Sequence, residues 1–112
     1  MRAPDLNRAL VLEHPQRIAD GSGGFATVWQ TLGTLWGAIR PGAGRETARN
    51  EMSLSRVPMR IVVRAAPMGA PSRPQAGQRF RAGARLFLIR AVTEYDAQAR
   101  YLTCHVEEEV AA

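Results

Sequence analysis

Two strand-like runs around a glycine-rich turn constrain the fold of this chain more than any other feature. The first run is Arg8 to Glu13, and the second extends from Phe25 to Arg40. Between them, residues 16–24 contain Asp20-Gly21 and Gly23-Gly24, which suit the positive φ angles of a tight turn. Pro15 is expected to end the first strand, because proline cannot donate to a strand ladder. The pattern predicts an antiparallel hairpin and therefore a β-rich fold.

Two tryptophans in the second run test how regular that strand is. Trp29 and Trp36 have opposite parity, so a regular strand would place them on opposite faces. A bulge near Gly33 would return both rings to one face, where we expect them to pack in or beside the core. Stacking on nucleic-acid bases is the alternative. Core packing is preferred because only three Phe, two Tyr and two Trp are present to build a core.

The rest of the chain continues the β pattern after an interruption. Residues 41–57 contain good helix formers and few β-branched residues, which predicts a short helix or an ordered loop. Further strands are expected at 58–65, 79–82, 85–93 and 100–107, with a proline-rich loop at 66–78. About six strands with regular turns predict an all-β fold, a small β-barrel or sandwich. Residues 1–7 are expected to be a flexible N-terminal arm and residues 108–112 a frayed C-terminal tail.

Length and charge limit what the protein can be. The chain has 112 residues, enough for one domain, and no apolar run approaches the ~20 residues that span a bilayer. No signal peptide is evident, and the single Cys104 indicates a reduced, cytoplasmic setting in which it is a small buried hydrophobe. All fifteen basic residues are arginine and the net charge is +5. This suits DNA or an acidic partner, although a GC-rich genome also explains the missing lysine.

No arrangement of side chains points to catalysis. His14, His105 and one cysteine do not form a recognisable metal set, and no serine lies in a nucleophile elbow. The turn at 20–24 lacks the Gly-Lys-Ser/Thr that opens a helix in a phosphate-binding loop. Glu107 to Glu109 lie at a chain end, where their carboxylates stay hydrated. The sequence therefore predicts a protein that is not an enzyme and has no metal or cofactor.

Charge placement supplies the candidate functional residues. Residues 40–64 hold six arginines against two glutamates, and the C-terminal tail is acidic. Such a split could drive head-to-tail packing of identical subunits into a closed ring, or place arginines near DNA phosphates. A solvated, exposed face is the alternative interpretation. The candidate contacts with a neighbouring subunit, an adaptor or a DNA channel are Arg40, Arg45, Glu46, Arg49, Glu51, Arg56, Arg60 and Arg64.

Seven short segments occur in a characteristic order along the chain. They are Leu10 to Glu13, Gly23 to Phe25 leading to Val28-Trp29, Leu35 to Ile39, Arg45-Glu46, Ile61 to Arg64, the Gly83 turn into Leu86 to Val92, and Tyr95-Asp96. This order resembles the phage head–tail joining family, also called head-closure or stopper proteins, which occurs in gene transfer agents too. The resemblance covers roughly residues 6–108. The Arg/Ala-rich, lysine-free composition of the chain resembles that of an alphaproteobacterial source, hence a prophage or gene transfer agent component.

The resemblance implies a small barrel with a long insertion, here residues 41–57, between its second and third strands. It implies a homo-oligomeric ring, six subunits by preference and twelve as the alternative, in the neck of a virion assembled in the bacterial cytoplasm. The implied partners are the portal–adaptor complex, the tail terminator and packaged double-stranded DNA, with no membrane. The ring would close the DNA channel after packaging and dock the tail.

Two alternatives remain open from the sequence. One is a small nucleic-acid-binding barrel of the OB or SH3-like type, and the other is the tail terminator of the same assembly.

The insertion is strongly basic, whereas a channel through which DNA slides is often acidic. Its arginines are therefore expected to face the adaptor or a neighbouring subunit.

Overall fold

Seven antiparallel strands make up the fold of the protein. The computed structural model describes residues 3–42, 48–49 and 54–111, and none of these residues is helical. No helix that could cross a membrane therefore occurs in these ranges. The strands are β1 (Arg8–Ala19), β2 (Phe25–Pro41), β3 (Ala48–Arg49), β4 (Leu54–Arg64), β5 (Arg79–Ala82), β6 (Arg85–Glu94) and β7 (Tyr101–Ala111).

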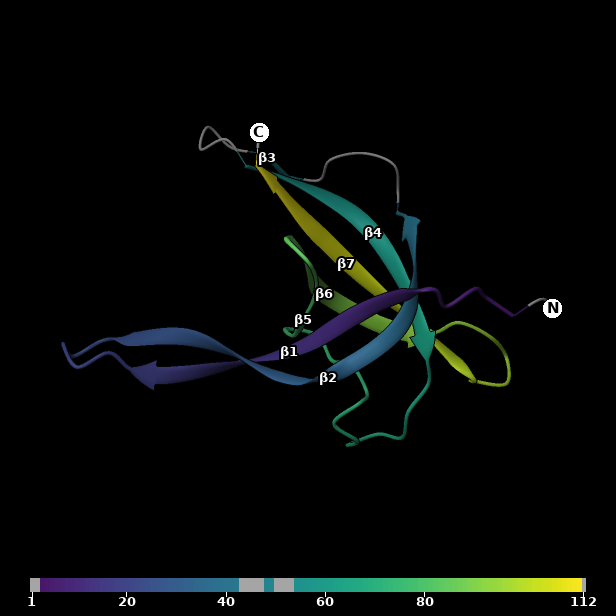
Figure 1. Cartoon of the computed structure of the whole chain (residues 1–112), viewed down its shortest axis with the longest axis horizontal. Helices are drawn as coiled ribbons and strands as arrows, with labels where there is room; N and C mark the ends of the chain where they lie inside the picture. The colour runs from purple at the N-terminus through teal and green to yellow at the C-terminus, as the bar shows by residue number, and fades with distance from the viewer. Residues whose placement is uncertain (1–2, 43–47, 50–53, 112) are drawn as a thin grey trace.

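Six of these strands close into a barrel (Figure 1). The hydrogen-bonded order is β2-β1-β5-β6-β7-β4-β3, and an additional β2–β4 pairing joins the two sides of the sheet. The short β3 lies outside the ring and pairs only with β4, Ala48 opposite Arg56 and Arg49 opposite Ser55. The expected all-β barrel is confirmed.

The barrel interior is filled by alternating apolar residues. Ile61 and Val63 of β4 are fully buried, as is Leu102 of β7, as their period-2 spacing predicts. Gly37 makes the β2–β4 closure possible: a Cβ there would lie 2.8 Å from Leu10 Cδ1 and 3.1 Å from the Val62 carbonyl oxygen. The buried cluster consists of Leu10, Leu12, Ile61, Val63, Phe80, Phe87, Ile89, Leu102, Cys104 and Val106.

The β1–β2 hairpin continues far beyond the barrel, and we call its projecting part, residues 14–30, the arm. It extends to the left in Figure 1 and contributes to the 53 Å length of the molecule. The expectation that Pro15 ends the first strand is wrong, because Pro15 pairs with Trp29 in the arm. The β1–β5 pairing ends at Glu13, so no described strand covers the outer edge of β1 at Pro15, and proline is tolerated at such an open edge.

The turn at the arm tip is shorter than expected. It covers residues 20–24, where Gly21 and Gly23 have φ angles of 82° and 86°, as their sequence predicts. Asp20 Oδ1 accepts hydrogen bonds from the backbone N–H groups of Ser22 (2.8 Å) and Gly24 (3.1 Å). This side chain holds the two strands of the arm together at their far end.

The bulge near Gly33 is confirmed, but the expected burial of both tryptophans is wrong. Leu12 pairs with Gly33 and Glu13 with Thr31, so β2 carries one extra residue. The bulge places Trp29 and Trp36 on the same face, since they pair with Pro15 and Ala9. That face is the outer one. Trp29 is half-buried, whereas Trp36 is 59% exposed.

Two further strands are longer than the sequence predicts. β4 begins at Leu54, so residues 54–57 of the expected insertion belong to a strand, while residues 43–47 and 50–53 lie outside the described part of the chain. β7 continues through Ala111, paired with β4, so the expected frayed tail is wrong for residues 108–111. The ladder with β4 runs to the pairing of Leu54 with Ala111, and ion pairs described below accompany it at residues 107–109.

Candidate interaction surfaces

Arginines from neighbouring strands neutralise the acidic end of β7. Arg85 forms a bidentate ion pair with Glu108, with nitrogen–oxygen distances of 2.7 Å and 2.9 Å. Arg90 approaches Glu107 at 3.9 Å, and Arg56 approaches Glu109 at 3.6 Å. The charge split between residues 40–64 and the tail is therefore partly satisfied within one chain, which removes Arg56 from the set of unpaired candidates.

The other candidate residues fall into two groups. Arg45, Glu46 and Glu51 lie outside the described residues, and so does the side chain of Arg49, whose backbone is in β3. Arg40, Arg60 and Arg64 alternate with inward-facing residues on β2 and β4, and Arg40 pairs directly with Arg60. These three arginines come together on the outer face of the barrel.

Two tyrosines complete this outer face. The Arg40 guanidinium lies 5.6 Å from the centre of the Tyr95 ring and donates a hydrogen bond of 3.4 Å to the Tyr95 hydroxyl. Arg64 lies 5.6 Å above the ring of Tyr101, its cross-strand partner. The two rings meet edge to face at 6.0 Å. We call Arg40, Arg60, Arg64, Tyr95 and Tyr101 the arginine–tyrosine surface.

This surface carries positive charge that the described residues do not neutralise by ion pairs. The ion pairs formed by the described residues involve arginines outside this surface. Arg60 instead donates a hydrogen bond of 3.1 Å from Nε to the Pro41 carbonyl oxygen. Asp5 lines a shallow hollow together with Arg40, and Glu107 lines another together with Arg60. Since the guanidinium groups lie over the tyrosine rings, the surface suits phosphate or carboxylate groups better than stacked bases.

The β6–β7 turn fixes both tyrosines through a buried aspartate. Asp96 Oδ1 accepts hydrogen bonds from the backbone N–H groups of Arg100 (2.9 Å) and Tyr101 (3.1 Å). Burial opposes ionisation of this carboxyl, but the hydrogen bonds and the charge of Arg100 outweigh it and lower the pKa of Asp96. Tyr101 pairs with Arg64, which is far from it in the sequence, so no local pattern indicates that the tyrosines belong to this surface.

An arginine clamp fixes the base of the arm. The buried carboxylate of Glu13 accepts hydrogen bonds from Arg79 Nε at 2.6 Å and Arg81 Nε at 2.9 Å. The Arg79 guanidinium also lies 4.1 Å from the centre of the Trp29 ring, and His14 Nδ1 is 3.2 Å from Gln78 Nε2. β5 therefore sets the direction in which the arm leaves the barrel.

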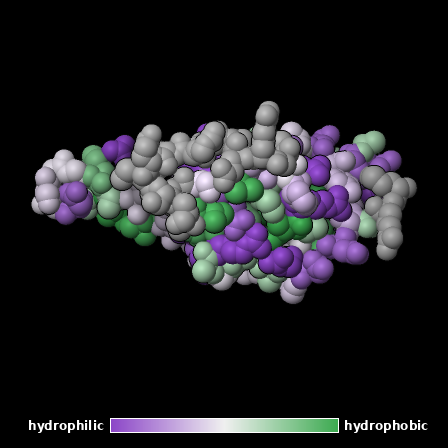
Figure 2. All heavy atoms as spheres, turned by 90° about the horizontal axis from the view of Figure 1, so that it is seen from above, coloured by the Kyte–Doolittle hydropathy of each residue, from purple (hydrophilic) through white to green (hydrophobic). Residues whose placement is uncertain are grey.

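Apolar side chains are exposed along the arm. Ile18 is 45% exposed, Val28 45% and Phe25 61%, and only the Arg17 guanidinium, 4.2 Å from the ring centre, lies over Phe25. Figure 2 shows hydrophobic atoms just behind the tip of the narrow left end of the molecule. A two-stranded ribbon without a core is marginally stable in water, so the arm has the character of a contact element.

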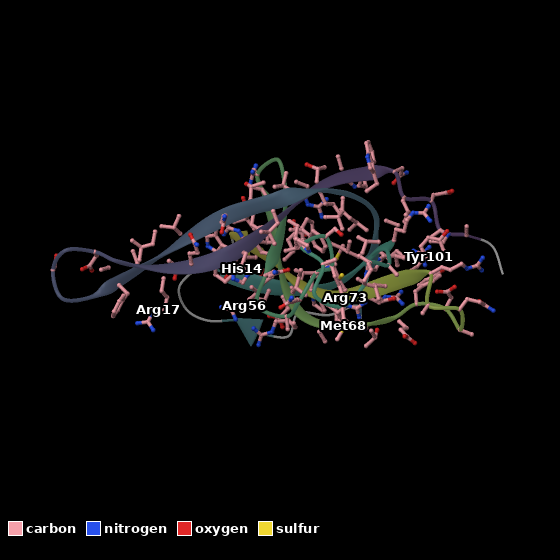
Figure 3. All side chains as sticks on the ribbon, turned by 90° about the horizontal axis from the view of Figure 1, so that it is seen from below. His14, Arg17, Arg56, Met68, Arg73 and Tyr101 are labelled. Atoms are coloured by element: carbon pink, nitrogen blue, oxygen red, sulfur yellow. The ribbon has the colours of Figure 1, made fainter. Side chains whose placement is uncertain are left out.

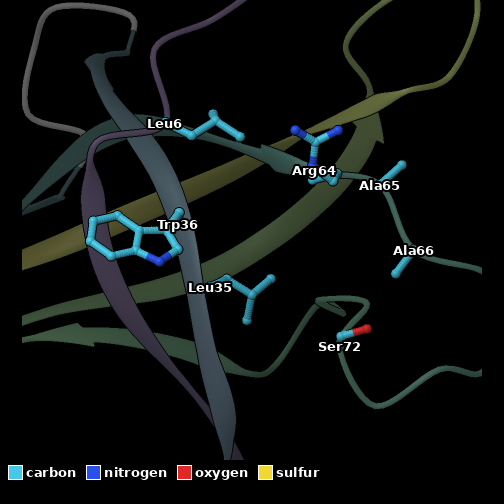
Figure 4. A pocket seen from close by; sticks show the side chains of 7 residues that line it. All are labelled: Leu6, Leu35, Trp36, Arg64, Ala65, Ala66 and Ser72. Carbon is cyan, nitrogen blue, oxygen red and sulfur yellow. The ribbon is translucent and has the colours of Figure 1, made fainter.

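A second apolar feature lies on the barrel (Figure 4). It is a hollow of about 450 Å³ formed by the N-terminal segment, β2 and the loop after β4. Arg64 of the arginine–tyrosine surface is its charged member. The lining residues are Leu6, Leu35, Trp36, Arg64, Ala65, Ala66 and Ser72.

The one cysteine is chemically protected. Cys104 is fully buried in the barrel, and burial raises the pKa of its thiol to about 12, with a smaller opposite effect of Arg73. We expect iodoacetamide at pH 8 to label the folded protein at least ~100-fold more slowly than the urea-unfolded chain, because only the thiolate reacts. Mass spectrometry of the time course measures this. Equal rates would contradict the buried position.

The fold is thus a closed barrel with a projecting arm and a charged outer face, and no cluster of metal-binding side chains occurs among the residues that the structure describes. A family model described as phage head completion protein matches residues 1–109. The chain therefore belongs to the phage head completion protein family, which is a family of virion structural proteins and not of enzymes.

Two solved structures are similar to this chain. A chain of the "Virion of native gene transfer agent (GTA) particle" is 51% identical, with a TM-score of 0.85 over 98% of this chain and 100% of that chain. Protein SF1141 from Shigella flexneri 2a shares the fold, with a TM-score of 0.65 at 18% identity, over 96% of each chain. No curated protein sequence matches the chain.

Proposed function

We propose that this protein is the head-completion connector of a phage-like particle of the gene transfer agent type. It forms a ring in the neck, between the portal-bound adaptor and the tail, closes the DNA channel after packaging and docks the tail terminator. The observation that carries the proposal is the 51% identity over nearly the whole chain to a component of a gene transfer agent virion. Six subunits are expected, with twelve as the alternative.

The surfaces of the barrel support a role in assembly. The buried core and the closed ring of strands make a rigid body, on which the arm and the arginine–tyrosine surface are the exposed contact elements. Arg40 and Arg64 lie over tyrosine rings, and arginines held in this way lose less side-chain entropy on binding than free ones. They suit acidic groups of the adaptor, of a neighbouring subunit or of packaged DNA.

Electron microscopy of particles from a strain lacking this gene tests the proposal. We expect separate heads and complete free tails, and heads that have lost their DNA if the ring also closes the channel. Heads that keep their DNA would favour the tail-terminator role in the same assembly over channel closure. Intact tailed particles in the strain lacking this gene would contradict the connector proposal.

The arginine–tyrosine surface also favours a second candidate, a small nucleic-acid-binding barrel. Three arginines on one outer face provide the charge that such a barrel needs. Fluorescence anisotropy with double-stranded DNA at several salt concentrations separates the two functions. Micromolar or tighter binding with a steep salt slope would support the nucleic-acid-binding barrel, whereas no binding by the isolated chain favours the connector.

We expect the Arg40→Gln/Arg64→Gln variant to fold with a stability within about 1 kcal/mol of wild type, because both side chains are partly solvated. Head–tail joining should fall at least ~10-fold, since each charged hydrogen bond lost to a partner costs about 1.5–3 kcal/mol. Counting joined particles by electron microscopy measures this.

Arg56→Gln is the matched control, because Arg56 lies on β4 and is already paired with Glu109. It removes one positive charge from the same strand as Arg64, where the double variant removes two, and should leave joining unchanged. Equal joining in the Arg40→Gln/Arg64→Gln variant and in Arg56→Gln would show that the arginine–tyrosine surface is not a contact.

A further inference from the structure

The arm has apolar side chains on both of its faces, so neither face is a purely polar, solvent-facing surface. Ile18 pairs with Ala26 and Val28 with Gln16, which places Ile18 and Val28 on one face, while Phe25, paired with Ala19, lies on the other. Beyond the β5 pairing, which ends at Glu13, no described strand covers the outer edge of β1. A partner that encloses the arm would bury these side chains and cover its open edges.

The arm is oriented before it meets any partner. Glu13 is held by two arginines, and one of them, Arg79, also lies against Trp29, so contacts from β5 reach β1 at the base of the arm and β2 within the arm. A pre-oriented element loses little conformational entropy on docking. The clamp therefore suits an arm that inserts into a site at a fixed position on a neighbouring body.

The hollow on the barrel matches the arm in character. Leu6, Leu35 and Trp36 give it an apolar lining, and Trp36 is 59% exposed. Arg64 lines the same hollow, and Asp20 at the arm tip forms no ion pair with a described residue. An apolar arm ending in a carboxylate thus complements an apolar hollow that contains a guanidinium group.

The two features lie at different ends of the molecule. The arm tip is at one end of the long axis, and the N-terminal segment that carries Leu6 is toward the other, as Figure 1 shows. Figure 3 likewise separates Arg17 of the arm from Tyr101 of the arginine–tyrosine surface. A contact between unlike surfaces of identical subunits is head-to-tail, and it generates a ring when the rotation closes.

We propose that the arm of each subunit inserts into the apolar hollow of the next copy of the same chain, with Phe25, Ile18 and Val28 as the apolar contacts and Asp20 facing Arg64. This contact rests on the proposed ring and identifies the surfaces that form it. Arm-to-arm pairing would instead stop at a dimer and leave both hollows uncovered. The arm could also dock on another virion protein, and the test below distinguishes that outcome from a contact between copies of this chain.

Cysteine pairing in assembled particles tests the contact directly. Ser22 at the arm tip and Ser72 at the hollow are both exposed, and the native Cys104 is buried. Particles carrying Ser22→Cys together with Ser72→Cys are treated with copper–phenanthroline and separated on non-reducing gels. We expect a ladder of covalent oligomers of this chain, with the number of bands limited by the number of subunits.

The single-cysteine variants are the controls, and neither should give the ladder. A dimer from Ser22→Cys alone would overturn the proposal in favour of arm-to-arm pairing, and a cross-link to a different virion protein would assign the arm to that protein. Joined particles without a ladder would also overturn the contact while leaving the connector function intact. Intact tailed particles without this gene would instead overturn the function.

A second variant keeps the proposal testable if the double-cysteine protein does not enter particles. Phe25→Ser changes an exposed residue, so the purified protein should keep its thermal unfolding temperature, while its amount per particle falls by at least ~10-fold. Val110→Ser removes a similarly exposed apolar group at the end of β7 and should have no such effect. Equal incorporation of Phe25→Ser, Val110→Ser and wild-type protein would overturn the proposal.

Discussion

Replacing Phe80 by alanine is expected to destabilise the protein by about 3–5 kcal/mol, because a large side chain that is fully buried leaves a cavity. Phe80 lies in β5, directly opposite Leu12 of β1 and Phe87 of β6, so it connects the two halves of the barrel. Urea unfolding followed by tryptophan fluorescence measures the change. In thermal unfolding, the midpoint should fall by roughly 15 °C.

Two matched variants separate this effect from a general sensitivity of the chain. Phe80→Leu keeps most of the buried volume and should cost less than about 1.5 kcal/mol. Phe25→Ala removes the same side chain from the exposed arm and should cost less than about 1 kcal/mol, since only its contact with Arg17 is lost. Similar losses in Phe80→Ala and Phe25→Ala would contradict the assignment of the core.

Replacing Glu13 by alanine is expected to cost about 2–3 kcal/mol, because it leaves Arg79 and Arg81 without their shared carboxylate. The cost stays below that of a fully buried charge, since the two arginine side chains are 22% and 41% exposed. Hydrogen exchange should increase first at the arm amides, near Trp29. Glu109→Ala breaks an exposed ion pair and should cost less than about 1 kcal/mol.

Acid should weaken the same clamp. Burial opposes ionisation of Glu13, but hydrogen bonds and charges from Arg79 and Arg81 outweigh it and lower the pKa of its carboxyl. The stabilisation is therefore complete above the unfolded-state pKa, near pH 4, and is lost as the pH falls through the lower folded-state pKa. Urea unfolding between pH 7 and 2.5 should show a shallower loss for Glu13→Gln, with Asp96 providing the rest. Identical slopes would contradict this.

The barrel core was predictable because strand alternation is a local property of the sequence. Ile61 and Val63 are buried as their spacing indicates, and so are Leu102, Cys104 and Val106. The length of the strands was not predictable in this way. Pro15 is tolerated because the arm has no third strand at that position, and this depends on where the distant β5 ends.

Local sequence patterns likewise predict only part of the surface contacts. Arg40, Arg60 and Arg64 were candidates from local charge, and they do meet on one face. Arg56 does not join them, since Glu109 reaches it from a strand more than fifty residues away. The glutamates of the tail looked hydrated in isolation for the same reason: their arginine partners lie on β4 and β6. Only the strand register brings such residues together.

Closure of the barrel also determines how the chain reaches its native state. The pairing of Val11 with Arg81, and of β4 with β7 along the whole length of β4, requires segments far apart in the sequence to meet before either is stabilised. Folds dominated by such non-local pairings take milliseconds to seconds to form. During that time β2 and β4 expose open edges that can pair with other chains. Aggregation in the cell should therefore compete with folding, and slower synthesis or lower temperature should raise the yield of soluble protein.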